Sequence, residues 1–292
     1  MKILIAGVRS ALGSRAAQLL RADGHEVVGL SRTASGPGFV SADVLDPVAT
    51  KAAVQQTAPE AIIQTLNALP KNGPRSSDDL RATARLRIEG TRNLIAAAEA
   101  AGVTRYVAEN FFFVYGTTAV DSPPVAEDYP IDKGSEEARS EDIQVREFGG
   151  VVLRCGLFYG PGVGSTEYLE GLVRRRRVPV VRGARNKGSY VHIDDAAAAV
   201  VAALNSGKPG SAYNIADDQP VGAHEFIREF AHQLGAPAPL AVPLWVVRLA
   251  AGKYMAAVLS ANLTLNNAKA RRELGWAPAY PTIADGLKTV VG

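Results

Sequence analysis

Two glycines near the N-terminus have a spacing that suits phosphate binding. Gly7 and Gly13 lie six residues apart, where the apolar run Lys2 to Gly7 gives way to a helical pattern that begins at Leu12. Such a turn brings backbone amides close to a pyrophosphate at the N-terminus of a helix. Ser10 stands where a third glycine is common, so a strand-to-helix turn without a ligand is the alternative. The residues expected to contact a dinucleotide here are Gly7, Arg9, Ser10, Ala11, Leu12 and Gly13.

The next apolar run indicates which dinucleotide would bind. It extends from Glu26 to Arg32 and ends in Ser31 and Arg32, without the acid that would bind the adenosine ribose of NAD. A guanidinium at this point can hold a 2′-phosphate through two hydrogen bonds, and Arg9 can reach the same phosphate from the glycine turn. The pattern therefore predicts NADP(H) rather than NAD(H), with two solvated arginines as the alternative.

Two further strand ends carry residues that suit the adenosine half of a cofactor. Asp43, which Val44 follows, can accept a hydrogen bond from the adenine amino group. Leu66, Asn67 and Ala68 follow a later strand, where small and apolar side chains can pack beside the ribose. We therefore expect both segments to lie along the cofactor.

These residues must be positioned by strands and helices that alternate along the chain. Apolar runs are followed by helical periodicities, among them a long helix at Ala82 to Ala101 and a helix at Ser135 to Phe148. The alternation predicts an α/β fold, a Rossmann-type doubly wound parallel sheet with a smaller C-terminal substrate-binding part. We expect an NADP-binding domain over residues 1–160. Residues 161–292 should be mainly substrate-binding, with some segments returning to the Rossmann core.

The composition limits the partners and the location of the protein. With 32 Lys and Arg against 29 Asp and Glu, the net charge of +3 is too small for a nucleic-acid surface. A single cysteine, Cys155, excludes an internal disulfide, and the first apolar stretch is too short for a signal peptide, so we expect a cytoplasmic protein. Leu240 to Leu263 is apolar but contains Arg248 and Lys253, so it should cap a pocket rather than span a membrane. We expect no metal site, and a monomer or homodimer.

Six motifs span almost the whole chain and point to one family. They are Ile88 to Val107, Val114-Tyr115-Gly116, Leu153 to Gly162, Val191 to Asp195, Tyr213 to Ala216, and Arg272 to Trp276. Together they resemble the extended short-chain dehydrogenase/reductases, which are NAD-dependent epimerase/dehydratase-like proteins. The resemblance implies that Gly7 to Gly13 cradles the pyrophosphate, that Asp43 and Val44 bind the adenine, and that Leu66 to Ala68 adjoins the ribose.

The resemblance also places residues near the nicotinamide. Asn110 and the stretch Cys155, Gly156, Leu157 and Phe158 are expected beside the cofactor. By contrast, His192 and Asp194 look structural, because a buried histidine satisfied by a neighbour is commoner than a general base. Nothing near Cys155 in the sequence would form its thiolate, so we expect it to pack rather than to react.

The usual proton donor of this family is missing from its expected place. The family combines a Ser or Thr on the fourth strand with Tyr and Lys four residues apart on the next helix; the phenol donates a proton and the ammonium lowers its pKa. Counting back from Val114-Tyr115-Gly116 puts Phe111 in the serine position. A phenyl ring can neither donate nor accept the proton.

The spacing Tyr-x-x-x-Lys does occur, as Tyr129 and Lys133, but in an unfavourable place. Ser135 is the expected N-cap of the following helix, so both residues would precede that helix. Anchoring instead on Glu141, which resembles the acid four residues past the family lysine, puts Lys133 and Glu137 at the Tyr and Lys positions. Both registers remain open. The candidates for proton transfer are Asn110, Tyr115, Tyr129 and Lys133.

Three consecutive aromatic residues suggest the substrate class. Phe111, Phe112 and Phe113 fall where sugar-using relatives contact substrate, so a sugar nucleotide is disfavoured and a flat aromatic ligand favoured, with at least one ring facing the core. The sequence thus predicts NADPH-dependent reduction of a ketone on a bulky, apolar, aromatic molecule. This resembles the atypical ketoreductases that tailor aromatic polyketides in antibiotic biosynthesis. A substrate phenol or an ordered water would supply the proton.

Two other functions fit the same sequence. One is redox-neutral chemistry, in which an epimerase, dehydratase or lyase keeps its nucleotide. The other is a non-catalytic NADP-sensing protein that binds a partner.

Overall fold

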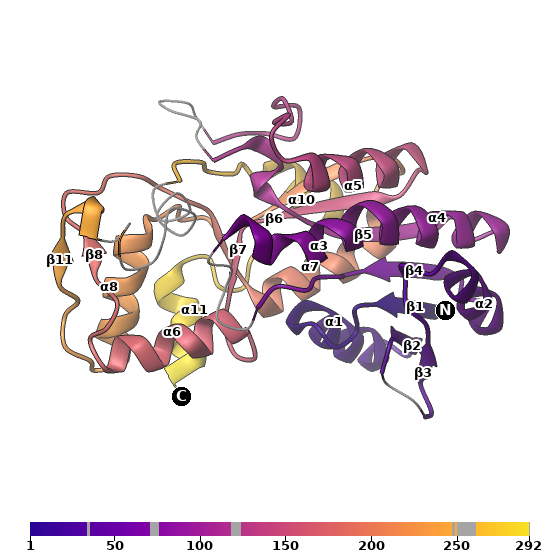
Figure 1. The fold of residues 1–292 in the computed structure, drawn as a ribbon, viewed down its shortest axis with the longest axis horizontal. Helices are drawn as coiled ribbons and strands as arrows, with labels where there is room; N and C mark the ends of the chain where they lie inside the picture. Colours follow the sequence, from indigo (N-terminus) through magenta and orange to yellow (C-terminus); the bar gives the residue numbers. More distant parts are fainter. Residues whose placement is uncertain (34–35, 71–75, 118–123, 247–248, 250–260, 292) are drawn as a thin grey trace.

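A parallel seven-stranded sheet forms the centre of the protein, which is analysed as a computed structural model (Figure 1). The structure describes residues 1–33, 36–70, 76–117, 124–246, 249 and 261–291. The strand order is β10-β6-β5-β4-β1-β2-β3. The strands are β1 (Lys2–Ala6), β2 (Glu26–Ser31), β3 (Phe39–Ser41), β4 (Ala61–Gln64), β5 (Arg105–Phe111), β6 (Val151–Cys155) and β10 (Ala212–Ile215). The predicted doubly wound parallel sheet is confirmed.

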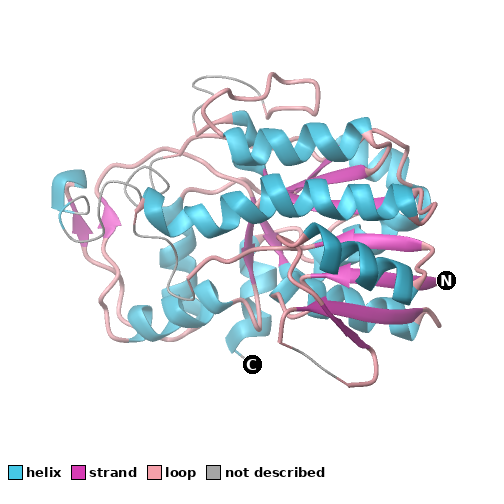
Figure 2. Cartoon of the chain, turned by 45° about the vertical axis from the view of Figure 1, so that its right-hand side comes forward, coloured by secondary structure: helices cyan, strands magenta, loops and turns pink. Residues whose placement is uncertain are grey.

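Helices cover both faces of this sheet because its strands are apolar on both sides (Figure 2). In β1, Ile3 and Ile5 face one core and Leu4 and Ala6 face the other. The helices of the first face are α1 (Ala11–Ala22) and α7 (Ile193–Ser206), which pack on each other. The helices of the second face are α2 (Pro47–Thr57), α4 (Thr91–Ala100) and α5 (Glu136–Glu147).

The C-terminal half contributes both to the sheet and to a smaller group of elements. Strand β10 lies at the edge of the main sheet, and α10 (Ala268–Leu274) packs on α7. The remaining elements form this smaller group, which lies beside the main sheet, toward the left of Figure 1. They are β7 (Leu157–Tyr159), α6 (Gly164–Arg174), β8 (Val180–Val181), β9 (Tyr190–His192), α8 (Ala223–Gln233), β11 (Ala241–Val242) and α11 (Ile283–Val291). A division at residue 160 remains a prediction, although β10 and α10 return to the main sheet and its helices.

The long helix predicted over Ala82 to Ala101 is interrupted by an irregular turn. A 3-10 turn at Ser77–Leu80 leads into α3 (Arg81–Arg85), and residues Leu86–Gly90 form a π-helical turn before α4 begins. Such turns widen a helix locally and occur most often at functional sites. Here the turn carries Arg87, whose side chain is 4% exposed.

Part of the predicted pocket cap cannot be placed. In the segment Leu240 to Leu263, residues 247–248 and 250–260 lie outside the described residues. Elsewhere, across the helices that the structure does describe, none is long and apolar enough to cross a membrane.

A fully buried ion pair fastens α5 to the sheet. Arg154 of β6 donates from Nε to Asp142 Oδ2 at 2.7 Å and from Nη2 to Asp142 Oδ1 at 3.0 Å. Arg154 also donates from Nη1 to the Tyr115 hydroxyl at 2.6 Å and to the Glu127 carbonyl at 2.9 Å. Since both charged side chains are 0% exposed, each depends on the other for solvation.

Removal of one partner should therefore be costly. We expect Asp142→Ala to lower the free energy of unfolding by about 3–5 kcal/mol, because it leaves the Arg154 charge buried. The surface pair of Glu170 and Arg174, at 2.9 Å, is the control, and Glu170→Ala should change stability by about 0.5 kcal/mol or less. Urea denaturation measures both. Equal losses for the two variants would contradict this account of the buried pair.

Candidate active site

The glycine turn lies where the strand order of the sheet reverses. Strand β1 has β2 on one side and β4 on the other, and doubly wound sheets bind ligands in the crevice at this point. Gly7 has φ +90°, and a Cβ there would stand 2.5 Å from the Thr65 carbonyl oxygen. A Cβ at Gly13 would stand 2.3 Å from the Gly7 carbonyl oxygen. Both glycines are thus required for the close approach of strand, turn and helix.

The first turn of α1 leaves backbone donors for an anion. Ser10 is the N-cap: its hydroxyl accepts from the Gly13 amide at 2.9 Å and donates to Thr65 Oγ1 at 3.1 Å. The first helical hydrogen bond is from the Ser14 amide to the Ser10 carbonyl, so the amides of Ala11 and Leu12 precede the helical ladder. This turn fits a pyrophosphate, with the positive end of the helix dipole directed at it.

Of the two arginines predicted to select NADP, Arg32 directly follows β2 and Arg9 lies in the glycine turn. Arg9 donates from Nη1 to Thr33 Oγ1 at 3.2 Å, which brings its guanidinium to the residue next to Arg32. Both arginines are exposed. The structure therefore brings the two cations to one side of the glycine turn, next to Ser31.

The residues predicted along the adenosine half lie on neighbouring strand ends. The Asp43 side chain is half-buried and accepts from the Leu45 amide at 3.0 Å, while the Val44 carbonyl accepts from Asn93 Nδ2 at 2.8 Å. Leu66, Asn67 and Ala68 follow β4 beyond Thr65, with Asn67 exposed. Their contact with a cofactor remains a prediction.

The phenylalanines after β5 differ in what they can contact. Phe111 is partly buried, and its ring centroid is 6.0 Å from that of Phe158 on β7. Phe113 is also partly buried, whereas Phe112 is 1% exposed and packs in a core with Val114. Phe112 is therefore wrongly placed in the substrate-lining set, because its ring is enclosed by the core. The expectation that at least one ring faces the interior is confirmed.

Two of the polar candidates are fully engaged in the framework. The Tyr115 hydroxyl accepts from Arg154 and donates to Asn214 Oδ1 at 2.8 Å, and burial raises its pKa to about 12. Asn110 is 0% exposed; its Nδ2 donates to the Ala138 carbonyl at 2.7 Å and its Oδ1 accepts from Arg87 at 2.8 Å. Neither side chain has a polar atom left over for a ligand.

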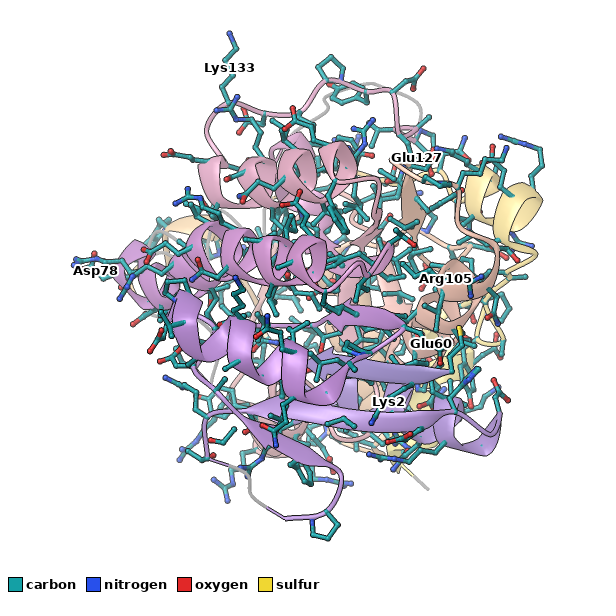
Figure 3. The ribbon with its side chains drawn as sticks, turned by 90° about the vertical axis from the view of Figure 1, so that its right-hand side faces the viewer. Lys2, Glu60, Asp78, Arg105, Glu127 and Lys133 are labelled. Atoms are coloured by element: carbon teal, nitrogen blue, oxygen red, sulfur yellow. The ribbon has the colours of Figure 1, made fainter. Side chains whose placement is uncertain are left out.

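The Tyr-x-x-x-Lys spacing is not on a helix. Tyr129 and Lys133 precede α5, whose N-cap is Ser135 as predicted, although the Ser135 hydroxyl donates to the Phe113 carbonyl instead of capping the helix. Figure 3 shows Lys133 projecting away from the protein body. Tyr129 packs edge-on against the buried Tyr115 ring, with centroids 6.0 Å apart. The structure thus does not build the usual dyad from these two residues.

Two of the four residues from Cys155 to Phe158 are exposed enough to contact a ligand. Cys155 and Gly156 are buried, and burial raises the pKa of the Cys155 thiol, so this thiol is unreactive as expected. Only Leu157 and Phe158 of this stretch are partly exposed.

His192 is structural, as expected: it is 0% exposed and its Nε2 lies 2.9 Å from Thr289 Oγ1.

One cluster of ionisable residues was not expected from the sequence. Arg87, Glu109 and Glu141 are all buried and meet beside Phe111. The sequence pattern used Glu141 only to set the register of the helix, as the acid four residues past the family lysine. A signal did exist, since Glu109 is a charged residue inside an apolar strand two positions before Phe111, and such residues are buried only with partners.

A polar cleft also lies at the opposite edge of the sheet. It is bordered by the amino end of β10 and by Glu127, Arg146, Lys269 and Arg272. Because the glycine turn is at the carboxyl edge, this cleft is separate from the candidate site.

Fold and site together define a dinucleotide-binding α/β protein, and the sequence profile of the NAD dependent epimerase/dehydratase family matches residues 3–216. The chain belongs to this family, and membership supports a nicotinamide dinucleotide as cofactor.

Among its relatives is a 3-diazoavenalumate denitrifying reductase from a Streptomyces species, 35% identical over 98% of this chain and 99% of the relative. A 2-alkyl-3-oxoalkanoate reductase of Stenotrophomonas maltophilia is 28% identical over 81% of this chain and 77% of the relative. A human epimerase family protein solved with NADPH has a TM-score of 0.83 at 21% identity, covering 100% of this chain and 99% of that chain.

The glycine turn can be tested by adding one methyl group. We expect Gly13→Ala to weaken NADPH binding about tenfold or more, because the new Cβ collides with the Gly7 carbonyl and displaces the helix N-terminus. Fluorescence titration measures the affinity. Gly171→Ala is the control, since no atom lies within 4 Å of its Cβ position on α6. Unchanged binding in Gly13→Ala would place the cofactor elsewhere.

Proposed function

We propose that this protein is an NADPH-dependent reductase of a bulky, apolar, aromatic substrate. The observation that carries the proposal is the pair of partly exposed rings, Phe111 and Phe158, at the sheet edge that also bears the glycine turn. When bound, the reduced nicotinamide supplies a hydride. The rings offer edge and offset contacts to a flat substrate and exclude water from it. The reductase that is 35% identical over 98% of this chain supports reduction.

A ketone is the acceptor that the sequence predicts. Its reduction forms one C–H bond from the hydride and one O–H bond from a proton donor. Phe111 cannot be that donor, and Tyr115 is held by Arg154 and Asn214. A substrate phenol, an ordered water or another protein group must therefore deliver the proton.

An aromatic diazo group is a second candidate acceptor, favoured by the relative named as a denitrifying reductase of a diazo compound. An arenediazonium ion is a cation, so adding a hydride already balances its charge. The C–N bond breaks, dinitrogen leaves, and a C–H bond takes its place, with no net proton consumed. Such a reaction would tolerate a chamber without the family's tyrosine.

The acceptor can be identified by incubating the protein and NADPH with a polycyclic aromatic ketone, an arenediazonium salt or UDP-glucose. We expect the NADPH absorbance to fall with an aromatic acceptor and to stay constant with the sugar nucleotide. Conversion of UDP-glucose without NADPH loss would favour redox-neutral chemistry. Tight NADPH binding with no turnover of any substrate would favour a sensor.

The preference for NADPH rests on Arg9 and Arg32. We expect Arg32→Ala to weaken NADPH binding roughly 10- to 100-fold and to leave NADH binding unchanged, because a charge-assisted hydrogen bond contributes about 1.5–3 kcal/mol. Arg175→Ala, which removes another exposed arginine beyond α6, is the control. Equal effects on the two nucleotides would contradict a phosphate contact at Arg32.

A further inference from the structure

The buried cluster beside Phe111 contains one cation and two carboxyl groups. Arg87, from the π-helical turn, forms a short hydrogen bond from Nη1 to Glu141 Oε2 of α5. Its Nη2 stands 3.6 Å from Glu109 Oε1 of β5, too far for a hydrogen bond. The three side chains are between 1% and 4% exposed.

The two carboxyl groups are not equally satisfied. Glu141 accepts from Arg87 and, at 2.6 Å, from Gln64 Nε2. Glu109 Oε1 is buried without any hydrogen-bond partner among the described residues, and so is Arg87 Nη2. An ionised carboxylate in this position would lack the donors it needs, whereas a protonated carboxyl costs far less to bury. The geometry thus favours Glu109 as the carboxyl that carries a proton.

Glu109 also lies at the level of the glycine turn and close to Phe111. Strand register aligns Ala6, Gln64 and Ala108 across β1, β4 and β5, so the next residues along these strands are Gly7, Thr65 and Glu109. Glu109 is therefore level with the glycine turn. It lies two residues before Phe111, and side chains two apart share one face of a strand. The Arg87 guanidinium stands 5.6 Å from the Phe111 ring centroid.

Stability alone does not account for such a cluster. Replacing buried ion pairs by apolar side chains of similar volume is often neutral or stabilising, so burying three ionisable groups together is weak evidence for a structural role. The π-helical turn that carries Arg87 is likewise a feature common at functional sites.

We propose that Glu109 is the proton donor of this reductase and that Arg87, shared with Glu141, holds the resulting carboxylate. The inference rests on the proposed function. As the hydride adds to the carbonyl carbon, the O–H bond of Glu109 breaks and its proton forms the new O–H bond of the alcohol. The Glu109 carboxylate then pairs with Arg87 until it regains a proton from water. Atoms and charge balance without another reactant.

Burial favours a proton in this cluster, and the unpartnered Oε1 is the observation that assigns it to Glu109. Burial raises the pKa of both carboxyls above the ordinary value, that of Glu141 to about 8, while Arg87 opposes the rise. The charged and titratable neighbours are Arg87 from the π-helical turn, Glu141 and Glu137 from α5, Tyr106 from β5 and Cys155 from β6. Two coupled acids beside one cation titrate as a pair.

Infrared spectroscopy of the protein without cofactor tests the proton directly. We expect the spectrum of the wild type minus that of Glu109→Gln to contain a protonated-carboxyl band at pH 7, and the same difference taken with the surface control Glu170→Gln to contain none. The buried carboxyl of Asp217, whose pKa burial raises to about 8, contributes equally to all three spectra and cancels. This readout needs no turnover, so it stands even if every aromatic acceptor proves inert and the proposed function fails. A wild-type-minus-Glu109→Gln difference spectrum with no such band would overturn the proposal.

Turnover provides the second readout. With an aromatic ketone, Glu109→Gln should lower kcat roughly 10²- to 10⁴-fold, while NADPH affinity and melting temperature stay near those of the wild type. Wild-type kcat should fall as the pH rises through the pKa of the pair, because the acid must be protonated, and Glu109→Gln should lose this dependence. Glu141→Gln should shift the fall to lower pH, since Arg87 is then free to stabilise ionised Glu109. An unchanged kcat for ketone reduction by Glu109→Gln would refute proton donation by Glu109. Turnover of a diazonium salt alone, with the same kcat in Glu109→Gln, would refute it as well.

Discussion

The reversal of strand order at β1 is the constraint on which the rest of the structure depends. Strands β2 and β3 leave β1 in one direction and β4, β5 and β6 in the other, so a crevice opens at the carboxyl edge between them. The tight packing of Gly7 against Thr65, and of Gly13 against Gly7, fixes strand, turn and helix beside this crevice. The residues assigned to cofactor or substrate lie at or just beyond the carboxyl ends of these strands.

Beside the crevice, phenyl rings and a buried charge cluster stand where the family pattern has hydroxyl-bearing side chains. Phe111 and Phe158 make it apolar, while Arg87, Glu109 and Glu141 are buried beside Phe111. A low-dielectric setting strengthens each interaction in such a cluster and makes an unsatisfied carboxyl costly unless it is protonated. The same desolvation that shapes an aromatic pocket can therefore hold a proton ready for use.

The sequence was sufficient for the fold. Strand and helix alternation predicted the parallel sheet, and Ser135 was correctly expected to begin α5. Phe112 was misassigned because three adjacent aromatics carry no sign of which ring a 3-10 turn directs into the core. The charged Glu109 inside an apolar strand was a signal for the cluster around Arg87, but its partners could not be named from the sequence. They lie on a π-helical turn and a helix, and only the packed fold brings them to Glu109.

The central claim is that hydride passes from a bound nicotinamide to an aromatic substrate in this crevice. It is tested most directly by single-turnover reaction with NADPH deuterated at the nicotinamide C4, followed by mass spectrometry of the aromatic product. The account predicts one deuterium on the reduced carbon of the product, delivered from one face of the nicotinamide only. Product without cofactor-derived deuterium, or label found only from deuterated water, would contradict it.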